Sequence, residues 1–290
     1  MVDPRRAWLD LQRDLGGDEV IFDVPFVPSF SDAADSLQRP ASPRTVPVTR
    51  RAVPLDPAPD PVSVVREWHV KEYPQGEAPT WAVDAPTIPG PGIDVVLPVR
   101  TAAAASWATL DDVAKSIASC TACPLCEGRT HTVPGEGNPH ADLMVVGEGP
   151  GEQEDLSGRP FVGRAGSLLD KMLDSIEIPR AQVFIANVVK CRPPRNRAPL
   201  PDERQACLPY LQRQIALVQP RVILALGGTA AEALLGVKQT LGSLRLKVHT
   251  LDSTPLVVTY HPAALLRNPN WKRPAWDDLR IARQLVDARR

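Results

Sequence analysis

The sequence of 290 residues lacks an apolar run that approaches the roughly 20 residues a helix needs to cross a bilayer. Its longest candidate, VILALGGTAAEALLGV, is interrupted by glycines, Thr229 and Glu232. The first residues, MVDPRRAWLDLQRDLGGDE, do not have the basic-then-apolar order of a secretory signal. We therefore expect a cytoplasmic protein that makes no membrane contact.

Cysteine and net charge are also scarce. The chain has five cysteines, and without an export signal these predict metal binding or free thiols rather than disulfides. Its 33 Lys and Arg nearly balance its 34 Asp and Glu. The basic residues are in excess only after residue 100, so this later region suits an anionic partner better than the acidic region before it.

Half of the 32 prolines fall in the first 100 residues, in stretches such as VPLDPAPDPVSVV. Proline disfavours helix at its own and the preceding position, so we predict a largely irregular extension or linker over residues 1–105, with a short helix at 5–15. Residues 106–290 form the predicted folded domain. The alternatives for the extension are a solvated tail and a segment that contacts another protein through one of its aromatic residues, Trp8, Phe22, Phe26 or Trp68.

Apolar runs and helical patterns alternate after residue 106. The runs lie at residues 142–148, 182–189, 221–227 and 255–262, and helical patterns follow each of them. This alternation predicts an α/β fold with a parallel sheet covered on both faces. Ligands bind such sheets at the carboxyl ends of the strands. The loops that begin after Val146, Val189, Leu226 and Tyr260 are therefore the candidate site.

The cysteines fall in two groups that are far apart in the chain. Cys120 and Cys123 form a C-x2-C pair, which Cys126 extends, and fifteen residues separate Cys191 from Cys207. A ferredoxin-like run is excluded because Thr130 stands where its fourth cysteine would be. Four thiolates from two distant segments suit either tetrahedral zinc or an iron–sulfur cluster, and the spacing leaves both open.

The stretch GEGPGEQED follows the first apolar run and crowds glycines and acids together. It is not a dinucleotide-binding loop, because Glu152 occupies the third glycine position, and no Gly-Lys-Ser/Thr follows as in a P-loop. Pro150 removes a donor that a phosphate nest would use. We interpret the stretch as a tight turn that brings bare backbone, Glu148 and Glu154 close to a ligand.

Three side chains near the other strand ends point to a small planar polar ligand. Phe161 lies in the glycine-bounded loop GRPFVGRAG, Asn187 interrupts an apolar strand, and His261 follows the last strand. An aromatic ring offers a stacking surface, and a carboxamide both donates and accepts hydrogen bonds. Basic residues surround Cys191 and form either a solvated loop or a phosphate-contacting patch: Lys190, Arg192, Arg195 and Arg197.

Taken in order, these motifs resemble the family-four uracil-DNA glycosylases, the iron–sulfur branch of the uracil-DNA glycosylase superfamily. The matching stretches, CTAC…EGRT, GEGNP, GEGPGEQED, GRPFVGRAG, NVVKCRPPRNRAPLPDE, a cysteine at 207 and HPAALLRNP, fall within residues 107–290. The related branch with an arginine-rich insertion before its final cysteine is not matched. The resemblance implies a three-layer α/β/α fold with a four-stranded parallel sheet.

The resemblance also implies a function and the residues for it. The enzyme would flip uracil out of single- or double-stranded DNA and hydrolyse its N-glycosidic bond, as a monomer, in base excision repair. A 4Fe–4S cluster would be held by Cys120, Cys123, Cys191 and Cys207, with Cys126 left over. The base pocket would be formed by Glu148, Gly149, Glu154, Phe161, Asn187 and His261, of which Glu148, Asn187 and His261 would be catalytic. DNA would be contacted by Lys190, Arg192, Arg195, Arg197, Leu265, Leu266 and Arg267.

Within that resemblance, Asn187 would read the O4 and N3 edge of uracil, Phe161 would stack on the base, and His261 would stabilise charge at O2. Glu154 would crowd the C5 position of thymine. Gly149 stands where better-known superfamily members have a water-positioning aspartate, so Glu148, backbone carbonyls and DNA phosphates are all candidates for that task. A wider range of deaminated bases, an iron–sulfur electron carrier and a DNA-binding module without catalysis remain alternatives.

Overall fold

The computed structural model describes residues 71, 73–74, 77–96 and 107–288. The helix predicted at residues 5–15 and the four aromatic residues named for docking lie outside these ranges. The division of the chain at residue 105 stays a prediction.

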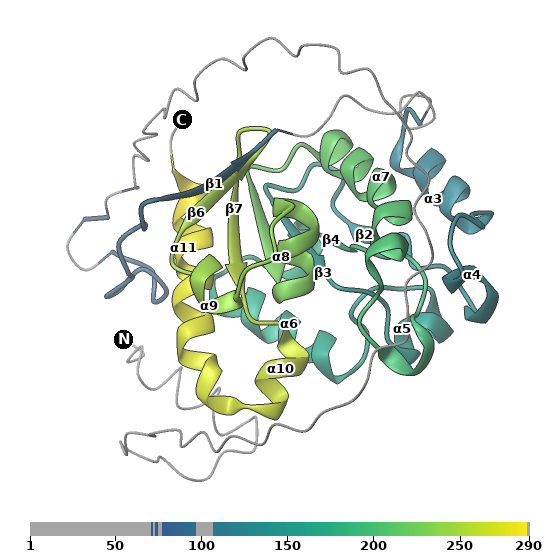
Figure 1. The fold of residues 1–290 in the computed structure, drawn as a ribbon. Coiled ribbons are helices and arrows are strands. Elements are labelled where there is room, and N and C mark those ends of the chain that lie inside the picture. The colour runs from purple at the N-terminus through teal and green to yellow at the C-terminus, as the bar shows by residue number, and fades with distance from the viewer. Residues whose placement is uncertain (1–70, 72, 75–76, 97–106, 289–290) are drawn as a thin grey trace, which may run out of the picture.

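A central sheet of seven strands has the order β1-β6-β7-β5-β3-β4-β2 (Figure 1). The strands are β1 (Pro91–Val95), β2 (Glu136–Gly137), β3 (Leu143–Gly147), β4 (Phe184–Asn187), β5 (Val222–Leu226), β6 (Val248–Leu251) and β7 (Thr254–Thr259). The four predicted strands are β3, β4, β5 and β7, and they pair in parallel. The α/β prediction is confirmed, but the expected count of four strands is wrong.

The three further strands have no continuous apolar run and therefore give no strand signal in the sequence. β1 has the sequence PGIDV, β2 has two residues, and β6 contains a histidine. β6 and β7 form an antiparallel hairpin whose turn residues, Asp252 and Ser253, have φ values of 45° and 71°. Two positive φ angles are typical of the two-residue turns that match strand twist. The sheet is therefore mixed, with a parallel centre.

Helices cover both faces of the sheet. They are α3 (Leu110–Ala118), α4 (Leu125–Gly128), α5 (Glu152–Ser157), α6 (Arg164–Ser175), α7 (Pro201–Val218), α8 (Gly228–Leu235), α9 (Leu241–Leu244), α10 (Pro262–Arg267) and α11 (Lys272–Asp287). Short 3-10 turns are η1 (Arg180–Gln182), η2 (Pro194–Asn196) and η3 (Pro269–Trp271). Among the described residues, no helix is both long and apolar enough to cross a membrane.

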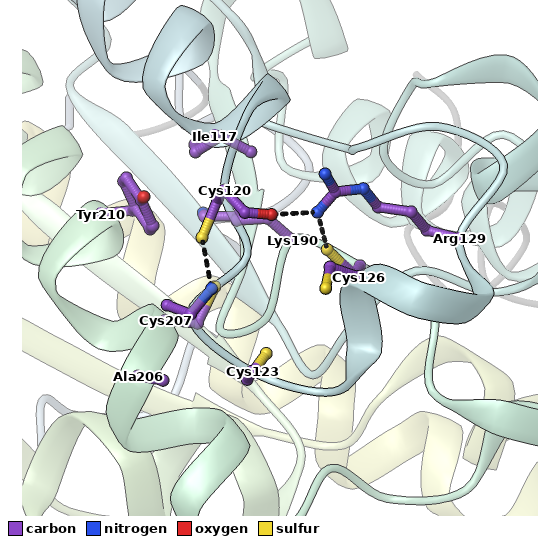
Figure 2. Close-up of a pocket in the computed structure, with 11 residues that line it drawn as sticks. Ile117, Cys120, Cys123, Cys126, Arg129, Lys190, Ala206, Cys207 and Tyr210 are labelled. Carbon is purple, nitrogen blue, oxygen red and sulfur yellow. Dashed lines mark hydrogen bonds between the residues drawn. The ribbon is translucent and has the colours of Figure 1, made fainter.

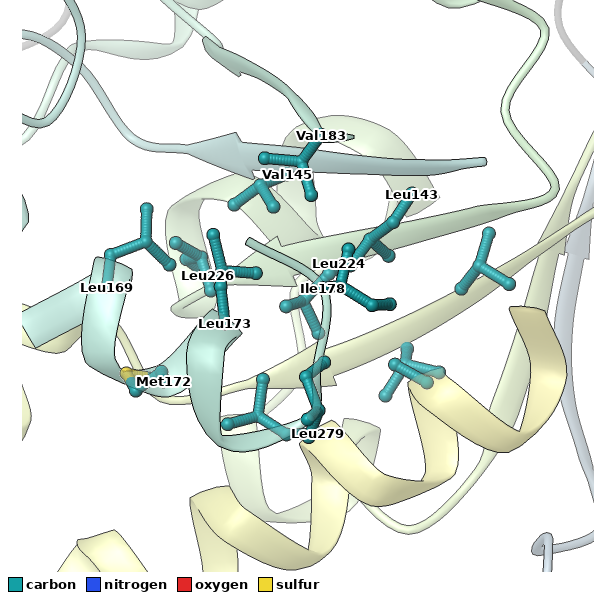
Figure 3. Close-up of a cluster of buried hydrophobic side chains, with 14 of the residues drawn as sticks. Leu143, Val145, Leu169, Met172, Leu173, Ile178, Val183, Leu224, Leu226 and Leu279 are labelled. Atoms are coloured by element: carbon teal, nitrogen blue, oxygen red, sulfur yellow. The ribbon is translucent and has the colours of Figure 1, made fainter. Parts of the chain in front are cut away.

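Successive residues of the central strands point to opposite faces of the sheet and build two cores. Leu143 and Val145 of β3 pack with residues of α6 and α11 (Figure 3). Met144 and Val146 of the same strand pack on the other face with residues of α7 and α8. The result is the three-layer α/β/α arrangement that the resemblance implies.

Part of the proline-rich segment belongs to this fold. Trp81 is 1% exposed and joins the core on the α11 face of the sheet. β1 pairs with β6, and the Ile93 amide donates to Nδ1 of the buried His249 at 2.9 Å. Residues within 77–96 therefore complete one edge of the domain.

Sheet register aligns the strand ends that carry the candidate site. Gly147 of β3 lies opposite Asn187 of β4, and Leu226 of β5 lies opposite Thr259 of β7. Because all four strands run in parallel, the loops after them emerge at one edge.

Candidate active site

A pocket of about 370 Å³ opens at the carboxyl ends of β3, β4 and β7. Ligand pockets commonly have volumes of about 300–1,000 Å³, so this one suits a small molecule or a single base. All six residues predicted to form a base pocket line it: Glu148, Gly149, Glu154, Phe161, Asn187 and His261. The structure thus brings together side chains from four separate stretches of the sequence.

Asn187 lies at the floor of this pocket with an unusual polar atom. Its side chain is 1% exposed, and Oδ1 has no hydrogen-bond partner. Buried polar atoms are nearly always partnered, so an orphan on a residue that lines a pocket marks a candidate ligand contact. Gly147 lies opposite Asn187 on the neighbouring strand. A Cβ added to Gly147 would collide with Oδ1 of Asn187 and lie 2.6 Å from Cζ of Phe161. Glycine is therefore required at 147 to leave the floor open.

Phe161 forms one wall of the pocket, in a strained backbone conformation. Its φ is 52°, a left-handed value that is uncommon outside glycine. Arg180 holds this turn by donating to the carbonyls of Phe161 at 3.1 Å and Pro160 at 2.6 Å. A Cβ on Gly166 would collide with the Phe161 carbonyl. The ring is thereby presented beside His261, with 5.5 Å between the ring centroids.

His261 caps the start of α10, and this contact determines its tautomer. Nδ1 accepts a hydrogen bond from the Ala263 amide at 3.2 Å, so the proton of the neutral ring sits on Nε2. Burial, together with the charge of Arg267, lowers the pKa of His261 to about 4. The ring is therefore neutral near pH 7 and can offer an Nε2–H donor to the pocket that it lines.

Glu154 fastens two loops of the pocket together. Oε1 accepts from the amides of Val162 at 2.9 Å and Gly163 at 3.1 Å, and Oε2 accepts from Gly151 at 3.1 Å. Both oxygens thus hold backbone at the start of α5 and α6. The role expected for this residue against the C5 position of a base stays a prediction, since the same carboxylate also fixes the shape of the wall.

Glu148 is held by a residue that the sequence did not point to as part of the site. Thr229, at the start of α8, donates to Oε2 of Glu148 at 2.5 Å. The loop after Leu226 was expected to approach the ligand. Thr229, which follows this loop, is connected to the pocket by its hydrogen bond to Glu148. At Gly149, an added Cβ would lie 2.7 Å from Cγ2 of Val189, so a side chain there requires the pocket wall to move.

Two of the residues predicted to contact DNA are buried, which corrects those predictions. Lys190 is 1% exposed and donates to the Asn187 carbonyl at 2.8 Å and to Oε1 of Gln214 at 2.6 Å. Leu265 is also 1% exposed, in the core cluster that includes residues of α6, whereas Leu266 is 40% exposed. Adjacent residues on a helix are about 100° apart, so only one of the two leucines can face outward.

The remaining predicted DNA contacts lie around the pocket mouth. Arg197 and Arg267 line the pocket, and Arg195 is exposed. Arg192 donates to the Asn196 side chain at 2.7 Å, and Arg197 forms a two-point ion pair with Glu203. These partners orient the two guanidinium groups but leave Arg197 partly exposed, with 38% of its side-chain surface accessible.

A second cavity is lined by all five cysteines (Figure 2). It lies between the segment that joins α3 and α4, the chain after β4, and α7. Arg129 donates from Nη1 to Sγ of Cys191 at 3.2 Å and to the Cys120 carbonyl at 2.8 Å. The structure therefore gathers the two distant cysteine groups, and it brings Cys126 to the same cavity as the four predicted ligands.

Burial in this cavity disfavours the charged forms of Cys191, Cys207 and Lys190. Burial raises the pKa of Cys191 and raises that of Cys207 to about 12, although the charge of Lys190 opposes the latter shift. Burial likewise lowers the pKa of Lys190 to about 8. Within the described residues, no three His, Cys, Asp or Glu side chains are grouped as ligands of a single metal ion.

Sequence reasoning missed four residues that hold these sites: Arg129, Arg180, Gln214 and Thr229. Each acts through one or two contacts that span between 19 and 81 positions of the chain. Arg129 and Thr229 do fall within stretches that the motifs flag, EGRT and the loop after Leu226. Arg180 and Gln214 give no local signal.

The fold and the pocket together define an α/β protein that binds a small planar polar ligand at the carboxyl ends of its strands, with arginines at the rim for an anionic neighbour of that ligand. The family model of the uracil DNA glycosylase superfamily matches residues 134–280 of the chain.

Curated relatives agree with that match. The chain is 43% identical over 187 residues to the type-4 uracil-DNA glycosylase of Sulfurisphaera tokodaii, covering 61% of this chain and 85% of that protein. It is 44% identical over 181 residues to the type-4 uracil-DNA glycosylase of Thermotoga maritima, covering 61% of this chain and 94% of that protein. For the type-4 enzyme of Pyrobaculum aerophilum the identity is 47% over 161 residues, which is 53% of this chain and 82% of that protein. The chain therefore belongs to the uracil DNA glycosylase superfamily, in its type-4 branch.

Proposed function

We propose that this chain removes uracil from DNA by hydrolysing the N-glycosidic bond, and that the pocket at the ends of β3, β4 and β7 holds the flipped base. The buried, unpartnered Oδ1 of Asn187 carries the proposal. It is an acceptor without a partner, on a residue that lines the pocket, and a base extruded from the duplex can supply the missing donor.

The carboxamide of Asn187 suits uracil and opposes cytosine. Oδ1 accepts from N3–H of uracil, while the amide nitrogen donates to O4. Cytosine has an acceptor at N3 and a donor at C4, so both contacts would be mismatched. Leaving buried polar groups unpaired discriminates strongly between ligands. Phe161 stacks on the face of the base.

His261 stabilises the leaving group without transferring a proton. As the glycosidic bond breaks, its electron pair goes to uracil, the negative charge spreads to O2, and the sugar acquires oxocarbenium character. A neutral ring with its proton on Nε2 donates a hydrogen bond to that oxygen. Water then adds to C1′ and releases a proton to solvent, and the uracil anion takes up a proton from solvent, which gives the abasic site and free uracil.

Glu148 positions the attacking water in this proposal. It is a carboxylate on the pocket wall next to Gly149, and the hydroxyl of Thr229 orients it. An aspartate at position 149 would require Val189 to move, which supports assigning the task to the neighbouring residue. Glu154 completes the wall where a thymine methyl group would enter.

The surface for DNA consists of Arg192, Arg195, Arg197, Leu266 and Arg267. The arginines neutralise phosphates on either side of the pocket mouth. Leu266, exposed on α10, fills the space that the extruded base leaves in the stack. Lys190 and Leu265 are not part of this surface because they are buried.

A 4Fe–4S cluster held by Cys120, Cys123, Cys191 and Cys207 fits the cysteine cavity. Its donor set is entirely sulfur, the ligand that iron–sulfur clusters use. Arg129, which donates to Cys191, is the kind of hydrogen-bond donor that stabilises a thiolate ligand. When bound, the cluster would supply a covalent link between the cysteine segment before α4 and the chain after β4. The arginines at 192–197 would thereby be held in register with the pocket.

The wider proposals concern the whole chain. Residues 106–290 form the catalytic domain, to which residues 77–96 add the edge strand β1 and the buried Trp81. The rest of residues 1–105 is an extension available to another protein, and the enzyme works as a cytoplasmic monomer. An electron carrier would need the cysteine cavity alone, and a binding module would need only the rim. Neither of these functions explains the unpartnered amide oxygen of Asn187 at the floor of the pocket.

The test incubates the full chain with a uracil-containing oligonucleotide and a matched thymine-containing one, followed by alkaline cleavage at abasic sites. Strand breaks confined to the uracil strand are expected. A shift in mobility without breaks would favour the binding module. Iron content and visible absorption of the purified protein distinguish an iron–sulfur cluster from zinc.

A further inference from the structure

Lys190 stands between the two sites of the protein. It lies three residues after Asn187, which ends β4, and directly before Cys191. Its side chain lines the cysteine cavity (Figure 2), yet its ammonium donates to the backbone carbonyl of Asn187. No other residue has been assigned to both sites.

The ammonium of Lys190 makes two hydrogen bonds inside the protein. Nζ donates to the Asn187 carbonyl at 2.8 Å and to Oε1 of Gln214 at 2.6 Å. An ammonium has three N–H groups, so a third remains after these two oxygens. Both oxygens are neutral, and a buried cation is costly unless an anion accompanies it. Lys190 lines the same cavity as Cys207, and its charge opposes the rise that burial causes in the pKa of that thiol.

Gln214 connects Lys190 to α7, the helix that carries Cys207. Cys207 and Gln214 are both buried on α7 and are seven residues apart, about two helical turns, so they lie on one face. Gln214 also donates to the Pro134 carbonyl at 2.6 Å, which fixes its amide and directs Oε1 at Lys190. The ammonium of Lys190 is thus fixed between the Asn187 carbonyl and the side chain of Gln214.

We propose that Lys190 is a positioning residue that links the thiolate site to the base pocket: it neutralises the cysteine ligands and at the same time holds the Asn187 carbonyl. This inference rests on the proposed function, since it assumes that a thiolate cluster occupies the cavity. It explains why a lysine is buried here at all. It also states that the geometry of the base-reading amide depends on an electrostatic partner of the cluster.

The experiment compares the full-length holoprotein with its Lys190→Met variant, which keeps the apolar stem and removes the charge. Iron per chain is measured first, and then the decay of visible absorption in excess ferrous-iron chelator. Replacing an outer partner of a metal ligand typically changes affinity or activity about 10- to 100-fold, so cluster loss should be faster by about that factor. Single-turnover uracil excision, normalised to the loaded fraction, should fall about tenfold because Asn187 is less firmly held.

Two further substitutions separate charge from positioning. Lys190→Arg keeps the charge with a bulkier head group, so the cluster lifetime should return toward that of the unmodified protein while excision stays low. Lys115→Met is the matched control: this lysine on α3 has 73% of its side chain exposed, and its removal should alter neither readout.

Unchanged chelator decay and unchanged excision in a folded Lys190→Met variant would overturn the inference. Should that variant not fold, Gln214→Met carries the test, with cluster loss about tenfold faster, in line with one lost hydrogen bond to a charged group. Equal decay in Gln214→Met and the unmodified protein would then overturn it. An unmodified protein that is inactive on uracil but contains iron would refute the proposed activity instead.

Discussion

Asn187 of the base pocket and Lys190 of the cysteine cavity are only three residues apart along the chain, but the two sites are built differently. The pocket is shaped by backbone: aligned strand ends, a glycine floor at Gly147 and the strained turn at Phe161. The cavity is shaped by side chains from segments outside the sheet, and burial raises the pKa of its Cys207 thiol to about 12. A rigid scaffold can prepare a pocket for a transient ligand, whereas buried thiolates need a permanent positive partner.

The largest effect should come from the group that faces developing charge. Replacing His261 with alanine removes the Nε2–H donor, and loss of one such donor typically lowers the rate about 10²- to 10³-fold. Single-turnover excision measures this, and DNA affinity should be nearly unchanged. His261→Asn, whose side chain can still cap α10, controls for helix stability. Parallel losses of binding and turnover in both variants would remove the proposed role.

Filling the floor of the pocket should be nearly as severe. In Gly147→Ala the new methyl group meets Phe161 Cζ at 2.6 Å and collides with Asn187 Oδ1, so the base has no room. Because small misplacements at a reacting centre can cost about 10²-fold, excision should fall by about that factor. Gly228→Ala is the matched control, since a Cβ there meets nothing within 4 Å. Normal excision in a folded Gly147→Ala protein would show that the floor is adaptable.

The Arg180→Ala variant tests whether the strained backbone of Phe161 needs the hydrogen bonds that Arg180 donates to this turn. Arg180→Ala removes two hydrogen bonds to successive carbonyls, each worth about 1.5–3 kcal/mol when the donor is charged. We expect about a tenfold lower kcat/KM and a lower melting temperature, without loss of bound iron. Arg221→Ala, which removes an exposed ion pair with Asp142, serves as the control. Loss of iron in Arg180→Ala would show that the two sites are not built independently here.

Thr229→Val tests the assignment of the water to Glu148. Valine keeps the shape of threonine but removes the hydroxyl that donates to Oε2. A net hydrogen bond is worth about 1 kcal/mol, so the excision rate should fall about fivefold with little change in DNA affinity. The neighbouring Thr240→Val substitution, at the cap of α9, should leave the rate unaltered. An equal rate in Thr229→Val would transfer the task to another group.

The smallest effect is a pH dependence of stability. The pKa of His261 is about 4 in the folded protein, below its ordinary value of 6.5, so the unfolded chain binds a proton between these values that the folded chain does not. The free energy of unfolding should therefore fall as the pH decreases from 6.5 to 4. His261→Asn should reduce that slope in denaturant titrations. The comparison between the two proteins is needed because burial raises the pKa of Asp278 to about 6, which contributes a slope of the opposite sign.

The central strands and the pocket residues could be predicted because they depend on local patterns. Four continuous apolar runs identified β3, β4, β5 and β7, and the loops after them supplied Glu148, Asn187 and His261. The edge strands β1 and β2 could not be predicted, because an edge strand needs no apolar run when only one side is paired. The interior strand β6 could not be predicted either, because its four residues include His249 and Thr250 and form no apolar run. The expected α/β class was therefore secure, but the strand count was not.

Residue type and spacing were enough to predict the alternation of strands and helices, the polar side chains at the strand ends and the two groups of cysteines. Only the tertiary structure decided that Lys190 turns inward, that Leu266 rather than Leu265 faces out, and that Thr229 and Arg180 hold Glu148 and Phe161. The physical reason is that burial and hydrogen bonding depend on which distant segments meet. A lysine before a cysteine has the same letters at a DNA surface and beside a buried thiol, and its neighbours in space determine which role it takes.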